Sequence, residues 1–216
     1  MYDETGEFSD PELGVRAVHE VYARQLPAYT GRLTVPVLWY RETEWIVSNE
    51  SADIVRMLGR FGRGPDLYPE PVRAAIDVWN ERIYATVNNG VYRAGFARTQ
   101  EAYDVAVTEV FETLDAIEDQ LQRTPWLTGE QFTEADLRLF PTLARFDVAY
   151  HYAFKCNLRR LIDYPALWAC ARRIYAMPGV AETVRFEVYK QGYFSPSELR
   201  NPLGIVPKGP IIDWSI

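Results

Sequence analysis

Apolar residues recur at every third or fourth position through most of the chain, which is the spacing of helices with one buried face. A first helix is predicted over residues 14–24 and ends before Pro27 and Gly31. A second opens at Ser51 and ends near Gly59 and Gly62. Farther along, two longer stripes predict helices that bury one another: Val72, Ile76, Trp79, Ile83 and Val87, followed by Tyr103, Val107, Val110, Phe111, Leu114, Ile117 and Leu121.

The last third of the chain continues this helical pattern and then ends it. Thr133 and Asp136 have the spacing of a capping box, in which each side chain bonds the backbone amide of the other residue, so a helix is predicted to start there. Further helical segments are predicted over residues 163–177 and 180–188. Residues 201–210 hold too many Pro and Gly for a helix and predict an extended surface tail.

A short strand pattern separates the first two helices. Residues 33–39 are predicted as a strand that contains Pro36, and residues 45–47 as a second strand. Residues 40–44 lie between them and predict a hairpin loop.

Gly and Pro concentrate over residues 62–71, a composition typical of a linker. The linker divides the chain into an α/β portion, residues 1–62, and an all-α domain, residues 71–216. The predicted fold class is therefore α/β followed by all-α, with two strands and flanking helices in the first part.

The composition is that of an ordinary globular protein, with 48% hydrophobic and 25% charged residues. A net charge of −7 argues against a nucleic-acid partner, which needs a basic face. No apolar run approaches the roughly 18 residues of a membrane span, so no membrane partner is expected. The acidic start of the chain lacks the apolar core of a signal peptide.

The two cysteines, Cys156 and Cys170, make no disulfide framework, and this usage is typical of a reducing cytoplasm. His19 and His151 are the only histidines, so no Cys/His cluster has zinc-binding spacing and no metal is expected. Lys155 favours a thiolate at its neighbour Cys156, but a cysteine in a helical domain is more often a small buried hydrophobic residue.

Val35 and Pro36 have the chemistry of a peptide-binding edge. An X-Pro bond in an apparent strand can be cis, which would present the backbone of Val35 to a ligand. An extended peptide could then pair with Val35 as an added strand. The alternative is an edge-strand proline without a ligand.

Glu50 and Ser51 stand just before a predicted helix. The helix N-terminus offers amides and a partial positive charge to a carboxylate, Ser51 can donate its hydroxyl, and Glu50 can pair with an ammonium. Together these groups would hold the zwitterionic head of an amino acid. The alternative is an ordinary serine cap beside a solvated glutamate.

A Val-Pro strand, a hairpin and a Glu-Ser helix start resemble the glutathione-binding half of a thioredoxin-like domain. The all-α remainder, with its capping box, resembles the C-terminal domain of glutathione transferases. Three longer segments, residues 80–100, 133–168 and 178–210, resemble one subgroup, the glutathionyl-hydroquinone reductases or xi-class glutathione transferases. The likeness runs from about His19 to Pro210, nearly the whole chain.

The resemblance implies a reaction, a co-substrate and a homodimer. In this family a cysteine thiolate attacks the sulfur of a glutathionyl-hydroquinone, the hydroquinone leaves, and glutathione resolves the mixed disulfide. The family's cysteine lies in a Cys-Pro-Trp-Ala-type motif that does not occur here. On this resemblance the chain lacks the N-terminal part with the catalytic cysteine, as a fragment or a natural short relative, and is expected to be inactive by itself. The alternatives are a non-catalytic binding or dimerising scaffold and, less favoured, another glutathione transferase that uses Tyr or Ser.

The resemblance also assigns roles to residues. Val35, Pro36, Glu50 and Ser51 match the family's glutathione contacts. The segments that supply the family's hydroquinone pocket contain three tyrosines, Tyr92, Tyr150 and Tyr193. Cys156 matches a family cysteine that is not the catalytic one, so no catalytic residue is expected in this chain.

Overall fold

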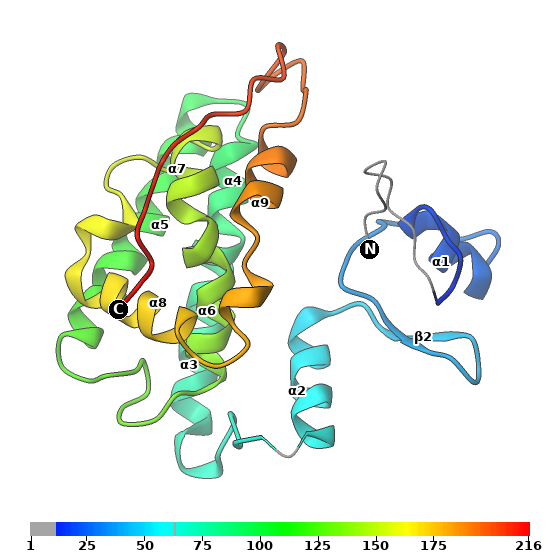
Figure 1. Ribbon diagram of the computed structural model, residues 1–216, viewed down its shortest axis with the longest axis horizontal. Coiled ribbons are helices and arrows are strands. Elements are labelled where there is room, and N and C mark those ends of the chain that lie inside the picture. Colours follow the sequence, from blue (N-terminus) through cyan, green and yellow to red (C-terminus); the bar gives the residue numbers. More distant parts are fainter. Residues whose placement is uncertain (1–11, 63) are drawn as a thin grey trace. The chain divides into compact units, whose positions relative to one another are not determined.

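The computed structural model describes residues 12–62 and 64–216. The chain divides into two compact units, Met1–Pro65 and Asp66–Ile216, and each is described by itself (Figure 1). None of the helices in the described ranges is both long and apolar enough to cross a membrane.

The first unit is built around a two-stranded antiparallel sheet. Helix α1 (Val18–Gln25) is followed by β1 (Leu38–Tyr40), β2 (Trp45–Ser48) and α2 (Ser51–Phe61). The register pairs Leu38 with Ser48 and Tyr40 with Trp45, with an irregularity after Leu38.

Two predicted boundaries in this unit are wrong. The first strand begins at Leu38 rather than at residue 33, because the partner strand β2 is only four residues long and offers no ladder to the residues before Leu38. Helix α1 begins at Val18 rather than at residue 14, where Gly14 has a φ of +63° that no right-handed helix accommodates.

The second unit is helical. Its longer helices are α3 (Arg73–Ile83), α5 (Gln100–Leu121), α6 (Glu134–Arg145), α8 (Pro165–Tyr175) and α9 (Phe186–Tyr193), and two short helices are α4 (Gly90–Gly95) and α7 (His151–Ala153). π-Helical turns, Tyr84–Asn88 and Phe146–Tyr150, precede α4 and α7. Short 3₁₀ turns occupy Glu70–Val72, Leu161–Asp163 and Ala181–Thr183.

The core of the helical unit follows the predicted stripes. Helix α5 packs against α4 and α8, and α3 packs against α6. Ile76, Ile83 and Val87 of the first stripe are fully buried, as are Val110, Leu114 and Ile117 of the second. The periodicity of the sequence therefore located the core correctly.

The predicted capping box is present at the start of α6. The Thr133 amide donates to Oδ2 of Asp136 over 3.0 Å. The helix predicted over residues 180–188 is wrong. Val184 has an extended backbone (φ −95°, ψ 107°), which separates the Ala181–Thr183 turn from α9.

Three buried carboxylates hold the loops of the helical unit by accepting backbone N–H groups. Oε1 and Oε2 of Glu118 accept the amides of Ala166 and Leu167, over 3.0 and 2.7 Å, so a side chain of α5 caps the N-terminus of α8. Asp136 accepts the Leu127 amide and Asp147 the Leu161 amide. Burial raises the pKa of Asp136 and of Asp147, and these backbone hydrogen bonds oppose the rise.

The tail after α9 has no regular secondary structure beyond Gly204, as predicted, and runs back along the helical unit (Figure 1). Trp214 anchors it among the rings of Phe140, Trp168, Tyr175 and Phe186. The ammonium of the buried Lys190 donates to the carbonyl of Lys208 over 2.7 Å. The tail is therefore held at two points.

Candidate functional site

Three tyrosine hydroxyls meet in the helical unit. Tyr92 comes from α4, Tyr150 from the end of a π-helical turn and Tyr193 from the end of α9. The hydroxyl of Tyr193 lies 2.5 Å from that of Tyr92 and 2.9 Å from that of Tyr150, and the hydroxyls of Tyr92 and Tyr150 are 3.3 Å apart. The structure therefore brings together the three tyrosines that the sequence singled out, over separations of up to 101 positions.

Aromatic rings support the three tyrosines, which we call the tyrosine cluster. Phe154 packs edge-on against Tyr92 and Tyr193, with ring centroids 5.4 and 5.6 Å apart, and stacks with Tyr150. Gly95 makes this possible, because a Cβ at that position would overlap the Phe154 ring. Neither Phe154 nor Gly95 was predicted, since their roles depend on contacts across the fold.

Two members of the cluster, Tyr150 and Tyr193, have raised pKa values. Burial raises the pKa of Tyr193 to about 12. Burial also raises the pKa of Tyr150, and the neighbouring Tyr92 and Tyr193 raise it further. The hydroxyls of Tyr150 and Tyr193 therefore stay neutral near pH 7, where each can donate to, or accept from, an oxygen of a bound molecule.

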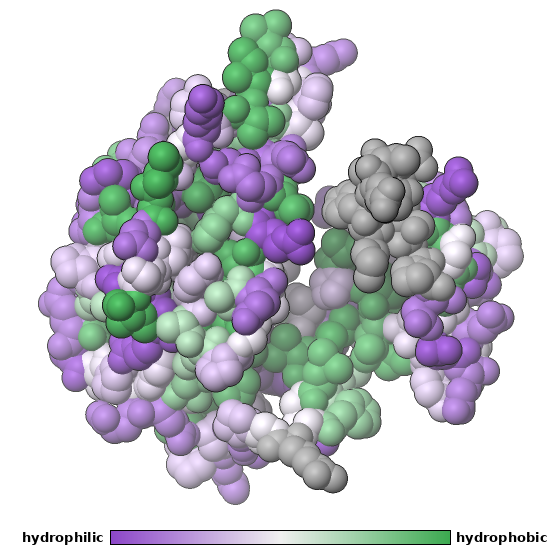
Figure 2. Space-filling model, viewed as in Figure 1, coloured by the Kyte–Doolittle hydropathy of each residue, from purple (hydrophilic) through white to green (hydrophobic). Residues whose placement is uncertain are grey.

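A cavity of about 660 Å³ opens beside the cluster, with Tyr193 in its wall. That volume lies within the range typical of small-molecule sites. Much of the wall comes from the loop after α9, whose hydrophobic side chains form the green surface at that end of the helical unit in Figure 2. The exposed apolar residues of this loop are Leu199, Leu203 and Ile205.

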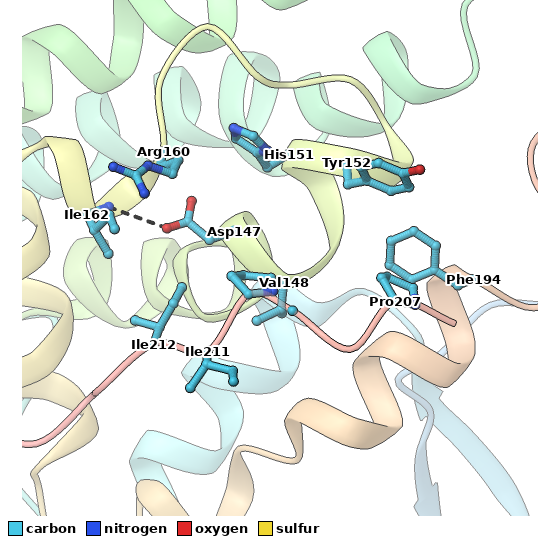
Figure 3. A pocket seen from close by; sticks show the side chains of 12 residues that line it. Asp147, Val148, His151, Tyr152, Arg160, Ile162, Phe194, Pro207, Ile211 and Ile212 are labelled. Atoms are coloured by element: carbon cyan, nitrogen blue, oxygen red, sulfur yellow. Dashed lines mark hydrogen bonds between the residues drawn. The ribbon is translucent and has the colours of Figure 1, made fainter. Parts of the chain in front are cut away.

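A second cavity, of about 280 Å³, lies under the tail (Figure 3). Val148, Ile211 and Ile212 give it an apolar wall. Its charged side chains are already engaged: Asp147 accepts backbone amides, one of them from Ile162, and Arg160 pairs with Asp163. The two charged side chains of this cavity are therefore engaged within the fold.

The first unit brings its four predicted residues to one end of the hairpin. Val35 and Pro36 precede β1 and are joined by a cis peptide bond, while Glu50 and Ser51 follow β2. Because Leu38 pairs with Ser48, these two segments leave the sheet at the same end.

Side chains that the sequence reasoning missed tie the two segments together. Nδ2 of Asn49 donates to Oγ1 of Thr34 over 3.3 Å and to the hydroxyl of Tyr22 over 3.1 Å. The Tyr22 hydroxyl donates to the carbonyl of Thr34 over 2.9 Å. Tyr22 fell within the helix predicted over residues 14–24, and no sequence signal marked Asn49.

The four residues predicted to contact glutathione, Val35, Pro36, Glu50 and Ser51, are exposed to solvent. Val35 is 71% exposed, and none of the described residues bonds its backbone N–H or carbonyl. No side chain caps the start of α2, where Glu50 is the N-cap residue, so Ser51 is not the ordinary serine cap that was the alternative. The edge and the helix start are both accessible to a small ligand.

Both cysteines are buried, and burial raises the pKa of each thiol to about 12. At neutral pH neither is a thiolate, the form that acts as a nucleophile.

Comparison with known proteins places this chain in a family. Residues 100–169 match the family model described as the C-terminal domain of glutathione S-transferase. The chain is 45% identical to the glutathione-bound structure of YqjG, a glutathione transferase homologue from Escherichia coli K-12. The TM-score is 0.93, and the match covers 99% of this chain and 72% of that one. The xi-class glutathione transferase of Natrialba magadii matches with a TM-score of 0.94 at 40% identity, over 99% of this chain and 67% of that one.

The chain belongs to the xi-class glutathione transferases, the family of the glutathionyl-hydroquinone reductases.

Two curated relatives carry the reductase name. This xi-class chain is 46% identical over 202 residues to the glutathionyl-hydroquinone reductase PcpF of Sphingobium chlorophenolicum, and 48% identical over 198 residues to YqjG of Escherichia coli. The matches cover 91% and 89% of this chain but 64% and 60% of the relatives' lengths. The predicted fold class, a partial thioredoxin-like portion followed by a helical glutathione transferase domain, is confirmed.

Proposed function

We propose that this xi-class chain takes part in the glutathione-dependent reduction of glutathionyl-hydroquinones. The observation that carries the proposal is the cluster of three mutually bonded tyrosine hydroxyls beside a cavity of small-molecule size. Relatives at 46% and 48% identity bear the name of this reductase.

The tyrosine cluster binds and polarises the hydroquinone ring. In the reaction a thiolate attacks the glutathionyl sulfur, and the bond from that sulfur to the ring carbon breaks with its electron pair moving to the carbon, which takes a proton. A mixed disulfide remains, and a second glutathione resolves it to glutathione disulfide. Neutral Tyr150 and Tyr193 donate hydrogen bonds to the ring oxygens, where negative charge spreads as the bond breaks.

The first unit holds the glutathionyl part. The backbone of Val35, ahead of Pro36, pairs with the peptide, and the start of α2 receives a carboxylate. Ser51 donates its hydroxyl to that carboxylate, and Glu50 pairs with the ammonium. Glutathione is thus the co-substrate, and no metal enters the scheme.

The attacking thiolate does not come from Cys156 or Cys170, whose buried thiols stay protonated. We therefore expect the 216-residue chain alone not to reduce a glutathionyl-hydroquinone. Turnover of such a conjugate, followed by release of free hydroquinone, is the measurement. Turnover that Cys156→Ser abolishes would overturn both the expectation and the assignment of that cysteine.

Binding tests the site separately from turnover. We expect hydroquinone to bind the chain and Tyr150→Phe to weaken that binding about tenfold, the effect of losing one hydrogen bond to a polar ligand. Tyr84→Phe is the matched control, because Tyr84 is exposed and lies outside the cluster. Equal binding by both variants would contradict the proposal.

The buried thiols favour a second candidate, a non-catalytic scaffold that binds glutathione and aromatic compounds and forms a homodimer. Two free cysteines fit a reducing cytoplasm. Binding without turnover, in the chain supplied with an external dithiol, supports the scaffold. A monomer in sedimentation equilibrium at micromolar concentration would remove the dimer.

A further inference from the structure

The cavity beside the tyrosine cluster is lined by basic side chains, although the whole chain carries a net negative charge. The chain has 30 acidic and 23 basic residues. A neighbouring cavity of about 470 Å³ shares Lys155 and Asn157 with the one of about 660 Å³. Arg200, Lys155 and Arg98 line these cavities, and among the described residues no Asp or Glu does. We call these three side chains the cationic rim.

Arg200 is held against the aromatic wall of the site. Its guanidinium lies 4.5 Å from the centroid of the Phe96 ring and 5.6 Å from that of Phe154. Both rings pack on Tyr92 of the cluster. A guanidinium that stacks on a ring keeps its N–H donors available at its edge.

Hydrogen bonds within the loop that carries Arg200 hold it in place. Asn201 and Ser197 exchange two backbone hydrogen bonds, of 2.9 and 3.1 Å. The Asn201 side chain donates to the carbonyls of Phe194 and Ile205. Within the described part of the chain, no carboxylate pairs with Arg200.

Lys155 is fixed in a similar way. Its backbone is left-handed, with a φ of 57°, and its carbonyl accepts the hydroxyl of Tyr103 over 2.7 Å. None of the described carboxylates forms an ion pair with its ammonium. Asp104 of α5, the residue after Tyr103, accepts the side-chain amide of Gln100 over 2.7 Å. A guanidinium held on aromatic rings and an ammonium on a held backbone, both without acidic partners, therefore line the cavity where the ring of a substrate would lie.

We propose that the cationic rim recognises an anionic substituent on the aromatic ring, so that the preferred substrates are hydroquinone conjugates that carry a ring carboxylate or sulfonate. The inference rests on the proposed function. The tyrosine cluster takes the ring oxygens, and Arg200 and Lys155 take the anion by charge-assisted hydrogen bonds. Such a bond discriminates by about tenfold between a charged and an uncharged ligand.

The test uses the 216-residue chain, with 2,5-dihydroxybenzoate and hydroquinone as probes in calorimetry at low salt. We expect the carboxylate-bearing probe to bind about tenfold more tightly. Arg200→Gln and Lys155→Gln should each reduce that preference, because they weaken binding of the benzoate more than binding of hydroquinone. Arg123→Gln, at an exposed position that lines neither cavity, is the matched control. Raising the salt concentration should weaken the preference, because exposed charges are screened.

The outcomes separate the two proposals. Equal affinity for both probes, with binding that depends on Tyr150, overturns the cationic rim and leaves the proposed function standing. Binding of the benzoate alone, dependent on Arg200 but not on Tyr150, supports the rim and overturns the hydroquinone site. Failure of both probes to bind the folded chain overturns both.

Discussion

The two units of the molecule differ in how much of their chain is buried and in the groups that we propose for ligand recognition. In residues 12–62 only Val15, Tyr22 and Ile54 are buried, and the groups proposed to hold glutathione lie on an exposed strand edge and at an exposed helix start. In the helical unit a continuous core surrounds side chains such as Tyr150 and Phe154. The first unit has few buried residues and exposes its proposed ligand groups, whereas packing in the second unit holds the tyrosine hydroxyls in place.

Because it has the larger buried core, the helical unit is expected to be the more rigid of the two. A two-stranded sheet is marginal by itself and its edges are open to pairing. We expect amides of residues 12–62 to exchange with solvent faster than those of α5 and α6. The four predictions below test whether the helical unit is as closed as its packing implies, and whether the units respond separately.

The largest effect is expected on the cysteines. Thiol pKa values of about 12 lower the thiolate fraction of Cys156 and Cys170 about a thousandfold relative to the ordinary value of 9.0. Iodoacetamide labelling at pH 8 should therefore be about a thousandfold slower in the native chain than in denaturant, followed by mass spectrometry. Rapid native labelling would show that the helical core opens readily.

The second-largest effect is expected from a substitution in the core of the helical unit. Leu114→Ala removes a fully buried side chain and should lower the free energy of unfolding of the helical unit by about 2–5 kcal/mol. Ile54→Ala, in the first unit, should leave that denaturant transition in place. If both substitutions shift one common transition, the two units unfold together and the comparison fails.

Glu118 offers a smaller effect. Glu118→Ala leaves the amides of Ala166 and Leu167 without an acceptor. It should lower the free energy of unfolding by about 1–3 kcal/mol, measured by urea unfolding. Glu112→Ala, at an exposed position of the same helix, is the control and should be near neutral. Equal effects would mean that the cap of α8 does not depend on Glu118.

The smallest effect concerns pH. Tyr193 titrates near 10 when unfolded but at about 12 when folded, so its contribution is complete below pH 10 and is lost as the pH rises toward 12. The unfolding midpoint should therefore fall over this interval, and Tyr193→Phe should make the fall shallower. An identical pH profile for the variant would rule out this source.

Local chemistry explains how much could be predicted. The stripes through Ile83 and Leu114 and the capping box at Thr133 are encoded within a few residues, so the helices and their core were found from the sequence. The tyrosine cluster was singled out by family resemblance. The length of β1 could not be predicted, because it depends on how much partner strand β2 provides.

Other features depend on long-range contacts. The bonds from Asn49 to Thr34 and from Glu118 to α8 join residues 15 and 48 or 49 positions apart, so no local pattern announces them. The cationic rim gathers Arg98, Lys155 and Arg200 from three segments. Only the fold shows that these charges line two neighbouring cavities.

Trp214 turns the anchored tail into an optical signal. The indole is 6% exposed and its ring centroid lies 4.7 Å from that of Trp168. Buried indoles emit at shorter wavelengths than hydrated ones, so the part of the emission that is lost in Trp214→Phe, among the six tryptophans of the chain, reports whether the tail is docked. Ligands that enter the cavity under the tail, or changes at Lys190, can thus be followed in the native protein without a label.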